Sequence, residues 1–308
     1  MRLLTLGLRR LGRLLLTVLL VSSVVFVVLR LVPGDPSQLI AGIDAAPQDI
    51  EALRVRLGTD RSVPLQYLEW IWGVARMQFG VSLITQRPVV AEILSRLPLT
   101  LTLAFLGLLF ALLLALPLGV ISAVRRGSVW DQLGMAISHA GMALPSFWLG
   151  ILLLLVFAVT LRWFPLFGSG RARHLVLPVV ALGLSRAAIL IRLTRASMLE
   201  ELGREYVVTA RAKGLPELLV RYKHALRNAL LPVITVAGIQ FGSMLGGAII
   251  VEQVFALPGL GRLFLTAVYQ RDFPLVQGGV VFVALVFSGV NFAVDLLYAA
   301  VNPRIEAR

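Results

Sequence analysis

Six long apolar runs constrain the fold of this chain more than any other feature of its sequence. Each of the last five reaches the roughly 20 residues with which an α-helix crosses ~30 Å of hydrocarbon. The chain is 58% hydrophobic with a mean hydropathy of +0.88, values that a soluble single domain does not carry. We therefore expect an all-α polytopic membrane protein with six transmembrane helices. The runs cover approximately residues 14–29, 98–124, 133–161, 175–193, 229–251 and 275–301.

The first apolar run follows a short basic stretch, as the apolar part of a signal peptide does. No small-x-small cleavage site comes after it, so we expect an uncleaved first span. The sequence VPGDP at 32–36 then ends the helix, because neither proline can continue it. Residues 1–32 are thus predicted to be a cytoplasmic N-terminus followed by the first transmembrane helix.

The polar stretch 33–97 is predicted to be an external loop region with short helices. One helix is expected at 47–58, where proline opens the segment and glycine closes it. A second is expected at 64–77, with aromatic residues that either suit the lipid headgroup zone or pack on the loop itself. Residues 98–308 would form a five-helix transmembrane core that includes a cytoplasmic loop at 195–228.

The arrangement of charge predicts the orientation of the chain. Its net charge is +13, and the tendency of arginine and lysine to remain in the cytoplasm explains this excess without nucleic-acid binding. With six spans, the basic clusters all fall on one side, so we expect both termini to be cytoplasmic. These clusters are Arg2, Arg9, Arg10 and Arg13, then Arg125 and Arg126, then 195–228, and finally Arg304 and Arg308.

The basic segment 195–232 is predicted to form an elbow of two short helices. A helix is expected at 201–213. Gly214 stands where that helix would end in a left-handed cap, and Pro216 stands where the next would begin. Such an elbow is either an ordinary basic loop or a docking surface beside the membrane.

The elbow resembles a known family. EYVVTARAKGLPELLVRYKHALRNALLP, at 205–232, resembles the conserved cytoplasmic loop of ABC-importer permeases, and most closely the dipeptide, oligopeptide and nickel permease family. Val208-Thr209-Ala210 stands where many importers have Glu-Ala-Ala, and Leu226-Arg227 where many have Leu-Pro. LGTDRSVPLQYLEW, FGVSLITQRPVVAEILSRLP and NFAVDLLYAAVNPR also resemble this family, so the likeness covers essentially the whole chain.

The resemblance implies a type I ABC-importer-like permease in the bacterial cytoplasmic (inner) membrane. Its partners would be a second homologous permease, two ABC ATPase subunits and an external substrate-binding protein. ATP and Mg would be bound by the ATPase subunits, and this chain would bind no cofactor. The elbow would be the coupling helix that docks in a cleft of the ATPase. The residues carried over to this contact are Glu205, Tyr206, Thr209, Ala210, Arg211, Lys213 and Gly214.

The chain lacks the sequence features of an enzyme. Its two lysines, Lys213 and Lys223, do not follow a glycine-rich loop, so there is no phosphate cradle for ATP hydrolysis. It has no cysteine, and its three histidines show no ligand spacing, so no metal site is expected. An intramembrane hydrolase would need a nucleophile–base pair that the spacing does not offer.

Arg186 is the charged residue that stands out within the membrane spans. It lies in the middle of the fourth run, whereas Arg192 and Arg195 are close enough to the cytoplasmic end to extend to the interface. Arg186 either lines the translocation path, where it would attract a peptide carboxylate, or pairs with Asp295. Both interpretations remain open from the sequence.

Two further patterns lie within the spans. Gly238, Gly242 and Gly246 follow one another at intervals of four and predict close helix packing, on a face that could also line the path. Asn291 and Asp295 lie on one polar stripe of the last span, and a carboxylate at membrane depth must face protein or water. A carboxylate tie to another helix is the expectation for Asp295.

The predicted cargo is a dipeptide or oligopeptide, with nickel, a metal chelate or glutathione as the alternatives. A secondary transporter driven by protons or sodium is the rival from another class. Such a transporter needs intramembrane carboxylates or broken helices at its midplane, and Asp295 is almost alone in this chain. The function expected is therefore that of a permease subunit in an ATP-driven importer.

Overall fold

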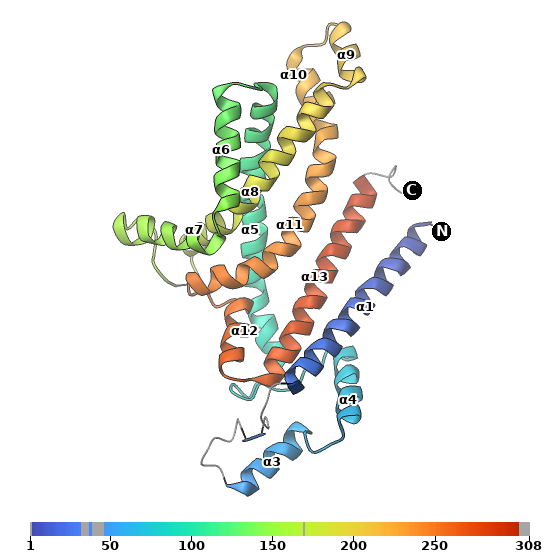
Figure 1. Cartoon of the computed structure of the whole chain (residues 1–308), viewed down its shortest axis with the longest axis vertical. Coiled ribbons are helices and arrows are strands. Elements are labelled where there is room, and N and C mark those ends of the chain that lie inside the picture. Colours follow the sequence, from blue (N-terminus) through green and yellow to red (C-terminus); the bar gives the residue numbers. More distant parts are fainter. Residues whose placement is uncertain (1, 32–36, 39–45, 169, 302–308) are drawn as a thin grey trace. The chain divides into compact units, whose positions relative to one another are not determined.

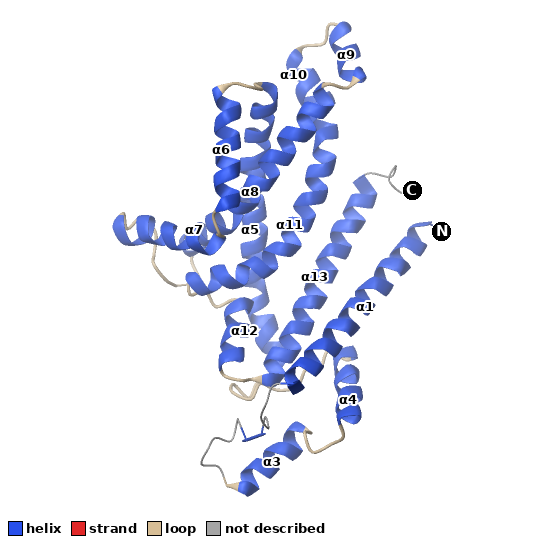
Figure 2. Cartoon of the chain, viewed as in Figure 1, coloured by secondary structure: helices blue, strands red, loops and turns tan. Residues whose placement is uncertain are grey.

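The structure is a computed structural model that describes residues 2–31, 37–38, 46–168 and 170–301; at 2–10, 53, 56–57 and 294–301 it describes the backbone alone. The described chain consists of helices joined by turns and loops, with an isolated backbone bridge between Val81 and Pro88. Figures 1 and 2 show this arrangement. The predicted all-α class is confirmed.

Five of the described helices are long and apolar enough to cross a membrane, and a bent helix pair raises this number to six if it counts as one span. These five helices match five of the six apolar runs. The last turns of α8 lie beyond the predicted end of the fourth run, and α5 begins before the second. The five helices are α1 (Arg2–Leu31), α5 (Val89–Val124), α8 (Arg173–Leu202), α11 (Leu226–Val254) and α13 (Phe273–Val301).

The third apolar run, predicted as one span at 133–161, is bent. It forms α6 (Val129–Ala143) and then α7 (Ser146–Leu153), which continues into the π-helical turn η1 (Leu154–Thr160). The two halves meet at an angle of 103°. Leu144 and Pro145 between them are extended, with ψ of 123° and 140°. The proline cannot continue α6, and α7 instead turns to pack against α8 and α11.

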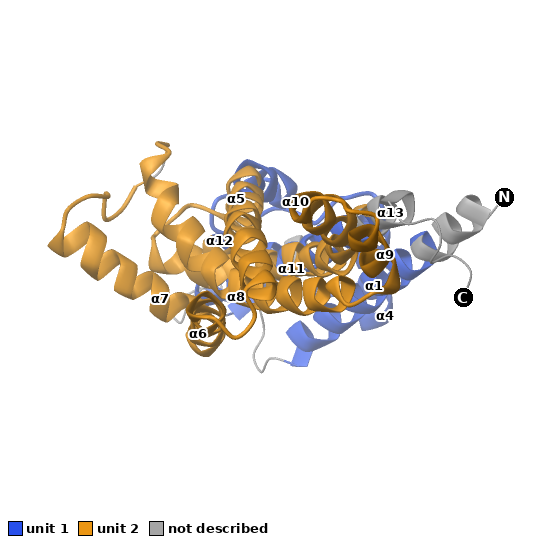
Figure 3. Ribbon diagram, turned by 90° about the horizontal axis from the view of Figure 1, so that it is seen from above, with its two compact units in different colours: residues 1–97, 263–292 blue, residues 98–262, 293–308 orange. Residues whose placement is uncertain are grey.

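The chain divides into two compact units, coloured separately in Figure 3. Unit 1 comprises residues 1–97 and 263–292, and unit 2 comprises residues 98–262 and 293–308. Unit 1 contains α3 (Pro47–Leu57) and α4 (Val63–Ala75), which confirm the two short helices predicted in the loop region. Most of α12 (Leu260–Tyr269) also belongs to it.

Within unit 1, polar contacts attach α4 to α1. The Trp70 indole donates from Nε1 to the Ser22 carbonyl at 3.1 Å, and the hydroxyls of Tyr67 and Ser23 are 2.7 Å apart. Tyr67 also packs edge-to-face on Phe26. Tyr67 and Trp70 therefore pack on α1, while Trp72 is exposed.

Within unit 2, small residues bring α5, α8 and α11 close together. Ala111 and Ala115 of α5, Ala187 of α8 and Ala237 of α11 lie in one buried cluster. A Cβ atom on Gly183 would lie 2.6 Å from the Gly107 carbonyl oxygen, so the backbones of α5 and α8 are in direct contact there. Such contact is how helices associate in a medium as apolar as their side chains.

Candidate functional site

The elbow was predicted within residues 195–232, and in the structure it comprises residues 203–225, between the end of α8 and the start of α11. It lies at one end of unit 2 (Figure 1). It contains α9 (Glu205–Ala212), α10 (Glu217–Leu219) and the π-helical turn η2 (Val220–Ala225). The helix predicted at 201–213 is in fact interrupted: α8 continues to Leu202, and an extended Arg204 with ψ of 148° precedes α9. The second predicted short helix is not separate either, because α10 and η2 run directly into α11.

A left-handed glycine makes the turn between α9 and α10, as the sequence predicts. Gly214 has a φ of +75°, and its N–H donates to the Arg211 carbonyl at 2.9 Å. Leu215 N–H reaches back to the Ala210 carbonyl at 3.4 Å. These bonds satisfy carbonyls that the end of α9 would otherwise leave without partners. Pro216 then precedes α10, where its missing N–H costs nothing.

The inner side of the elbow is attached to the helix bundle by apolar packing. Val207 and Ala210 of α9 are buried, as are Val220 and Ala225 of η2. Their cluster includes Met198 of α8, along with residues at the ends of α5 and α11. A displacement of α9 would therefore be transmitted to the ends of three long helices, since closely packed interiors resist compression.

Ion pairs and hydrogen bonds join the two arms of the elbow. Glu217 lies 3.0 Å from Arg211 across the turn and 3.6 Å from Arg221 on its own arm. Because these groups are about two-fifths exposed, each pair contributes at most ~1 kcal/mol. The Tyr206 hydroxyl donates to Glu201 at 2.5 Å and accepts from Asn228 at 3.1 Å. Partial burial raises the pKa of this phenol, as does the bond to Glu201.

The outer side of the elbow exposes apolar side chains among charged ones. Val208, Leu218 and Tyr222 are 57%, 70% and 53% exposed. Six of the seven residues carried over from the family are exposed on this elbow, and the seventh, Ala210, lies in the buried cluster beneath it. Ala210 is therefore placed to support the elbow from below. The exposed six are Glu205, Tyr206, Thr209, Arg211, Lys213 and Gly214.

Arg186 is half-buried in α8, with its side chain directed toward α11. Its Nη1 donates to Gln240 Oε1 at 3.1 Å, and its Nε is buried with no hydrogen-bond partner among the described residues. Arg192 is exposed. Arg195 forms a two-pronged ion pair with Asp131, in the first turn of α6, at 2.6 and 2.8 Å. The extension of Arg192 and Arg195 to the membrane interface stays a prediction.

The predicted glycine stripe is only partly a packing face within this chain. Gly238 and Gly242 are buried in α11. Gly246 is exposed, and a Cβ atom there would meet nothing within 4 Å. Asn291 is half-buried in α13, and the side chain of Asp295 lies outside the described residues.

Glu252 is a functional candidate that the sequence interpretation missed. It is fully buried at the end of α11, where its carboxylate accepts from Thr100 Oγ1 at 2.6 Å and from the N–H groups of Gly261 and Arg262 at 2.7 and 3.4 Å. The carboxylate therefore caps the start of α12 and joins it to α5 and α11. Gly259 lies against it: a Cβ atom there would be 2.2 Å from Glu252 Oε1. In the sequence, Glu252 is only an acid at the end of an apolar run, a few residues before a turn that contains Gly259 and Gly261.

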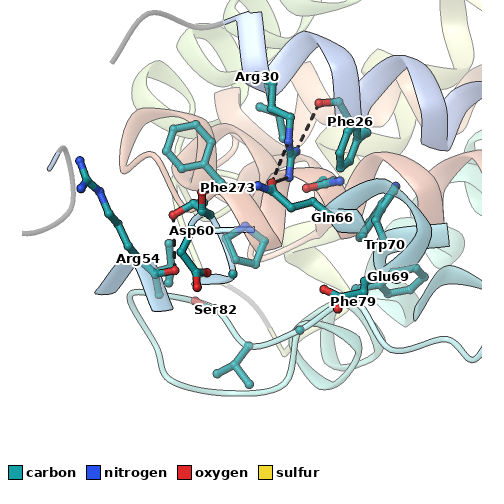
Figure 4. Close-up of a pocket in the computed structure, with 18 of the residues that line it drawn as sticks. Phe26, Arg30, Arg54, Asp60, Gln66, Glu69, Trp70, Phe79, Ser82 and Phe273 are labelled. Atoms are coloured by element: carbon teal, nitrogen blue, oxygen red, sulfur yellow. Dashed lines mark hydrogen bonds between the residues drawn. The ribbon is translucent and has the colours of Figure 1, made fainter. Parts of the chain in front are cut away.

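Unit 1 contains a cavity of about 1090 Å³ that the sequence did not predict (Figure 4). On one side, Arg30 lies over the Phe26 ring at 3.5 Å and donates from Nε to Gln66 Oε1 at 3.1 Å. Other walls come from the loops around Asp60 and Ser82. None of the site residues inferred from the sequence lines this cavity.

Comparisons with known proteins agree with this architecture. Residues 115–307 match the family described as the inner membrane component of binding-protein-dependent transport systems, and residues 3–104 match the N-terminal part of such components. The glutathione transport system permease protein GsiC of Escherichia coli strain K12 is 43% identical over 298 residues, 97% of each chain. Its counterpart in Salmonella typhimurium is 43% identical over 299 residues, 97% of this chain and 98% of the relative.

Two solved structures share the fold. An inward-facing MetNI methionine ABC transporter matches with a TM-score of 0.56 and 22% identity, over 69% of this chain and 97% of its own. An amino acid ABC transporter crystallised with histidines matches with a TM-score of 0.53 and 18% identity, over 70% and 94%. Together with the family match, these likenesses establish a type I importer fold. The chain therefore belongs to the inner-membrane components of binding-protein-dependent transport systems, as an ABC-importer permease of the dipeptide, oligopeptide and nickel permease family, whose ATPase activity lies in partner subunits.

Proposed function

We propose that this permease imports short peptides, with glutathione as the leading candidate. The support for this cargo is the 43% identity to glutathione permeases over nearly the full length of both chains. Glutathione is a tripeptide, and it is one of the alternatives to the dipeptide or oligopeptide cargo predicted from the sequence. Nickel is less well supported, because the sequence offers no cluster of histidine, cysteine or methionine.

We further propose the assembly in which the chain works. It pairs with a second homologous permease, and the elbows of the two permeases dock on two ATPase subunits that bind ATP and Mg. An external binding protein delivers the cargo. Residues 1–32, 33–97 and 98–308 are a first span with its cytoplasmic N-terminus, an external loop region and a five-span core. Both termini and the loop 195–228 face the cytoplasm.

The mechanism proposed follows from the way the elbow is attached. Binding of ATP closes the ATPase pair and draws the two elbows together. Because Val207 and Ala210 pack on the ends of long helices, this movement changes the relative stability of the inward-facing and outward-facing states. The exposed Val208 and Leu218 supply apolar contacts to the ATPase, and the charged residues around them supply a polar rim. This exposed outer side is the observation that carries the proposal of docking at the elbow.

The elbow proposal is tested by placing charge on its outer side. In Val208→Glu and Leu218→Glu together, two apolar contacts become carboxylates that would have to be desolvated in the interface. We expect loss of ATPase co-purification and of ATP-dependent glutathione uptake in proteoliposomes supplied with the binding protein. Val55→Glu, an equally exposed valine on α3, is the matched control and should change neither.

Two results would count against these proposals separately. Normal ATPase capture by the elbow variant would remove the elbow as the docking site. Glutathione uptake that is absent from the unaltered complex, while a dipeptide is imported, would instead remove glutathione as cargo and leave the peptide importer in place.

A further inference from the structure

The guanidinium of Arg186 lacks a counter-ion among its described contacts. Its one described acceptor is the neutral amide oxygen of Gln240, at 3.1 Å from Nη1. The Ser243 hydroxyl lies 3.2 Å from that oxygen, but its shorter contact, at 2.8 Å, is with the backbone carbonyl of Gln240. The Arg186 Nε is buried and has no partner among the described residues. A guanidinium has five N–H groups, so most of its donors have no acceptor in the described part of the chain.

A stretch of α11 without a side chain lies beside this guanidinium. Gly247 follows Ser243 by one turn and Gln240 by two turns. A Cβ atom on Gly247 would lie 3.5 Å from Arg186 Nη2 and 3.4 Å from Leu182 Cδ1. The guanidinium therefore lies next to the bare backbone of α11 at this position.

Arg186 lies in the middle of a helix that is long and apolar enough to span the membrane. A charge at that depth is costly unless an anion or water accompanies it, and Gln240 and Ser243 are both neutral. The group that completes the site must therefore carry negative charge. A permanent anionic partner within the chain would offset the free energy of placing the Arg186 charge at this depth whether or not cargo is present. A transient anionic ligand would offset it only while that ligand is bound.

We infer that Arg186, with Gln240 and the bare backbone at Gly247, is a subsite for a carboxylate of the transported peptide. A guanidinium matches a carboxylate with two parallel hydrogen bonds, so it is suited to a peptide that ends in such a group. Gln240 holds the arginine toward α11. This inference rests on the proposed function, since it assigns a role to one part of the peptide path.

The absence of cysteine from the chain allows the charge to be removed and restored at one position. In Arg186→Cys, we expect binding-protein-dependent glutathione uptake to fall by at least about tenfold, the effect of ~1.4 kcal/mol. Binding-protein stimulation of ATP hydrolysis should remain. Treatment with 2-aminoethyl methanethiosulfonate, which attaches an ammonium group with its own N–H donors, should return much of the uptake, while a neutral methyl methanethiosulfonate should not. Arg192→Cys, on the exposed side of the same helix, is the matched control and should respond to neither reagent.

Two outcomes would overturn the subsite. Equal recovery with the neutral and the cationic reagent would show that charge at this position is irrelevant. Restoration of uptake by Asp295→Asn in an Arg186→Gln background would show that the arginine serves an internal ion pair. A different result would be that the binding protein does not stimulate ATP hydrolysis by the unaltered complex. That result would count against the importer assembly and not against the subsite.

Discussion

Glu252 shows how much one buried side chain contributes to the arrangement of α12. Its carboxylate accepts three hydrogen bonds, two of them from backbone N–H groups at the start of that helix. In Glu252→Gln, an NH₂ group would face those donors, and each unsatisfied buried group costs about 1–3 kcal/mol. We expect a lower melting temperature of the purified complex and faster tryptic cleavage after the exposed Arg262.

The control for that substitution is Glu200→Gln. Glu200 forms its ion pair with Arg204 on an exposed surface, where such a pair contributes at most ~1 kcal/mol. The melting temperature and the cleavage after Arg262 should therefore remain near those of the unaltered protein. If Glu252→Gln behaved like this control, the carboxylate would not be the group that holds the start of α12.

At the same scale, the sequence revealed Arg186 but not Glu252. An arginine in the middle of an apolar run is conspicuous, because the neighbouring residues are all uncharged. Glu252 lies at the end of a run, where an acid next to a loop is ordinary. Its partners are backbone N–H groups brought to it by the fold, and sequence spacing does not reveal which ones they will be.

At the scale of elements, the turn at Gly214 is the feature whose loss has the most predictable effect. Its φ of +75° costs a non-glycine residue about 1–2 kcal/mol. We expect Gly214→Ala to loosen the elbow, with faster tryptic cleavage after Arg211 and Lys213 and weaker ATPase capture. Gly12→Ala makes the same substitution inside α1, where a Cβ atom has free space. There alanine should be neutral or favourable to the helix, by up to about 1 kcal/mol.

Local signals predicted element ends well, and bends poorly. The cap at Gly58, with a φ of +67°, and the cap at Gly214 follow from what glycine alone does easily. The hydropathy of the third run did not predict its 103° angle, which arises because α7 packs against α8 and α11. The continuity of η2 with α11 likewise depends on apolar contacts beneath the elbow that no short stretch of sequence encodes.

At the scale of the whole molecule, the apolar runs were enough to predict a helical membrane protein, but not the division into two units. Unit 1 joins residues 1–97 to residues 263–292, segments that are far apart in the chain. Its cavity takes walls from both segments, for example around Arg30 and Phe273. Pairings between such distant segments depend on tertiary packing, and the pattern of hydropathy along one sequence does not specify them.

The bent pair of α6 and α7 decides the topology of the whole chain. If the pair crosses the membrane, four crossings precede the elbow and one precedes α3, so the elbow and α3 lie on opposite sides. If the pair enters and leaves on one side, three crossings precede the elbow, and both lie on the same side. Arginine and lysine cluster at both termini and in the elbow, and these clusters all lie on the same side of the membrane only if the pair crosses. Since such clusters remain in the cytoplasm, they favour the crossing arrangement.

Single cysteines in this cysteine-free chain distinguish the two arrangements. Ala52→Cys on α3 and Thr209→Cys on the elbow both replace exposed residues. In intact spheroplasts, we expect a membrane-impermeant maleimide to label position 52 and to reach position 209 only after the membrane is opened with detergent. The unaltered chain should take up no label and is the control. Labelling of both positions before detergent treatment would mean that the pair does not cross, and it would place the elbow beyond the reach of a cytoplasmic ATPase.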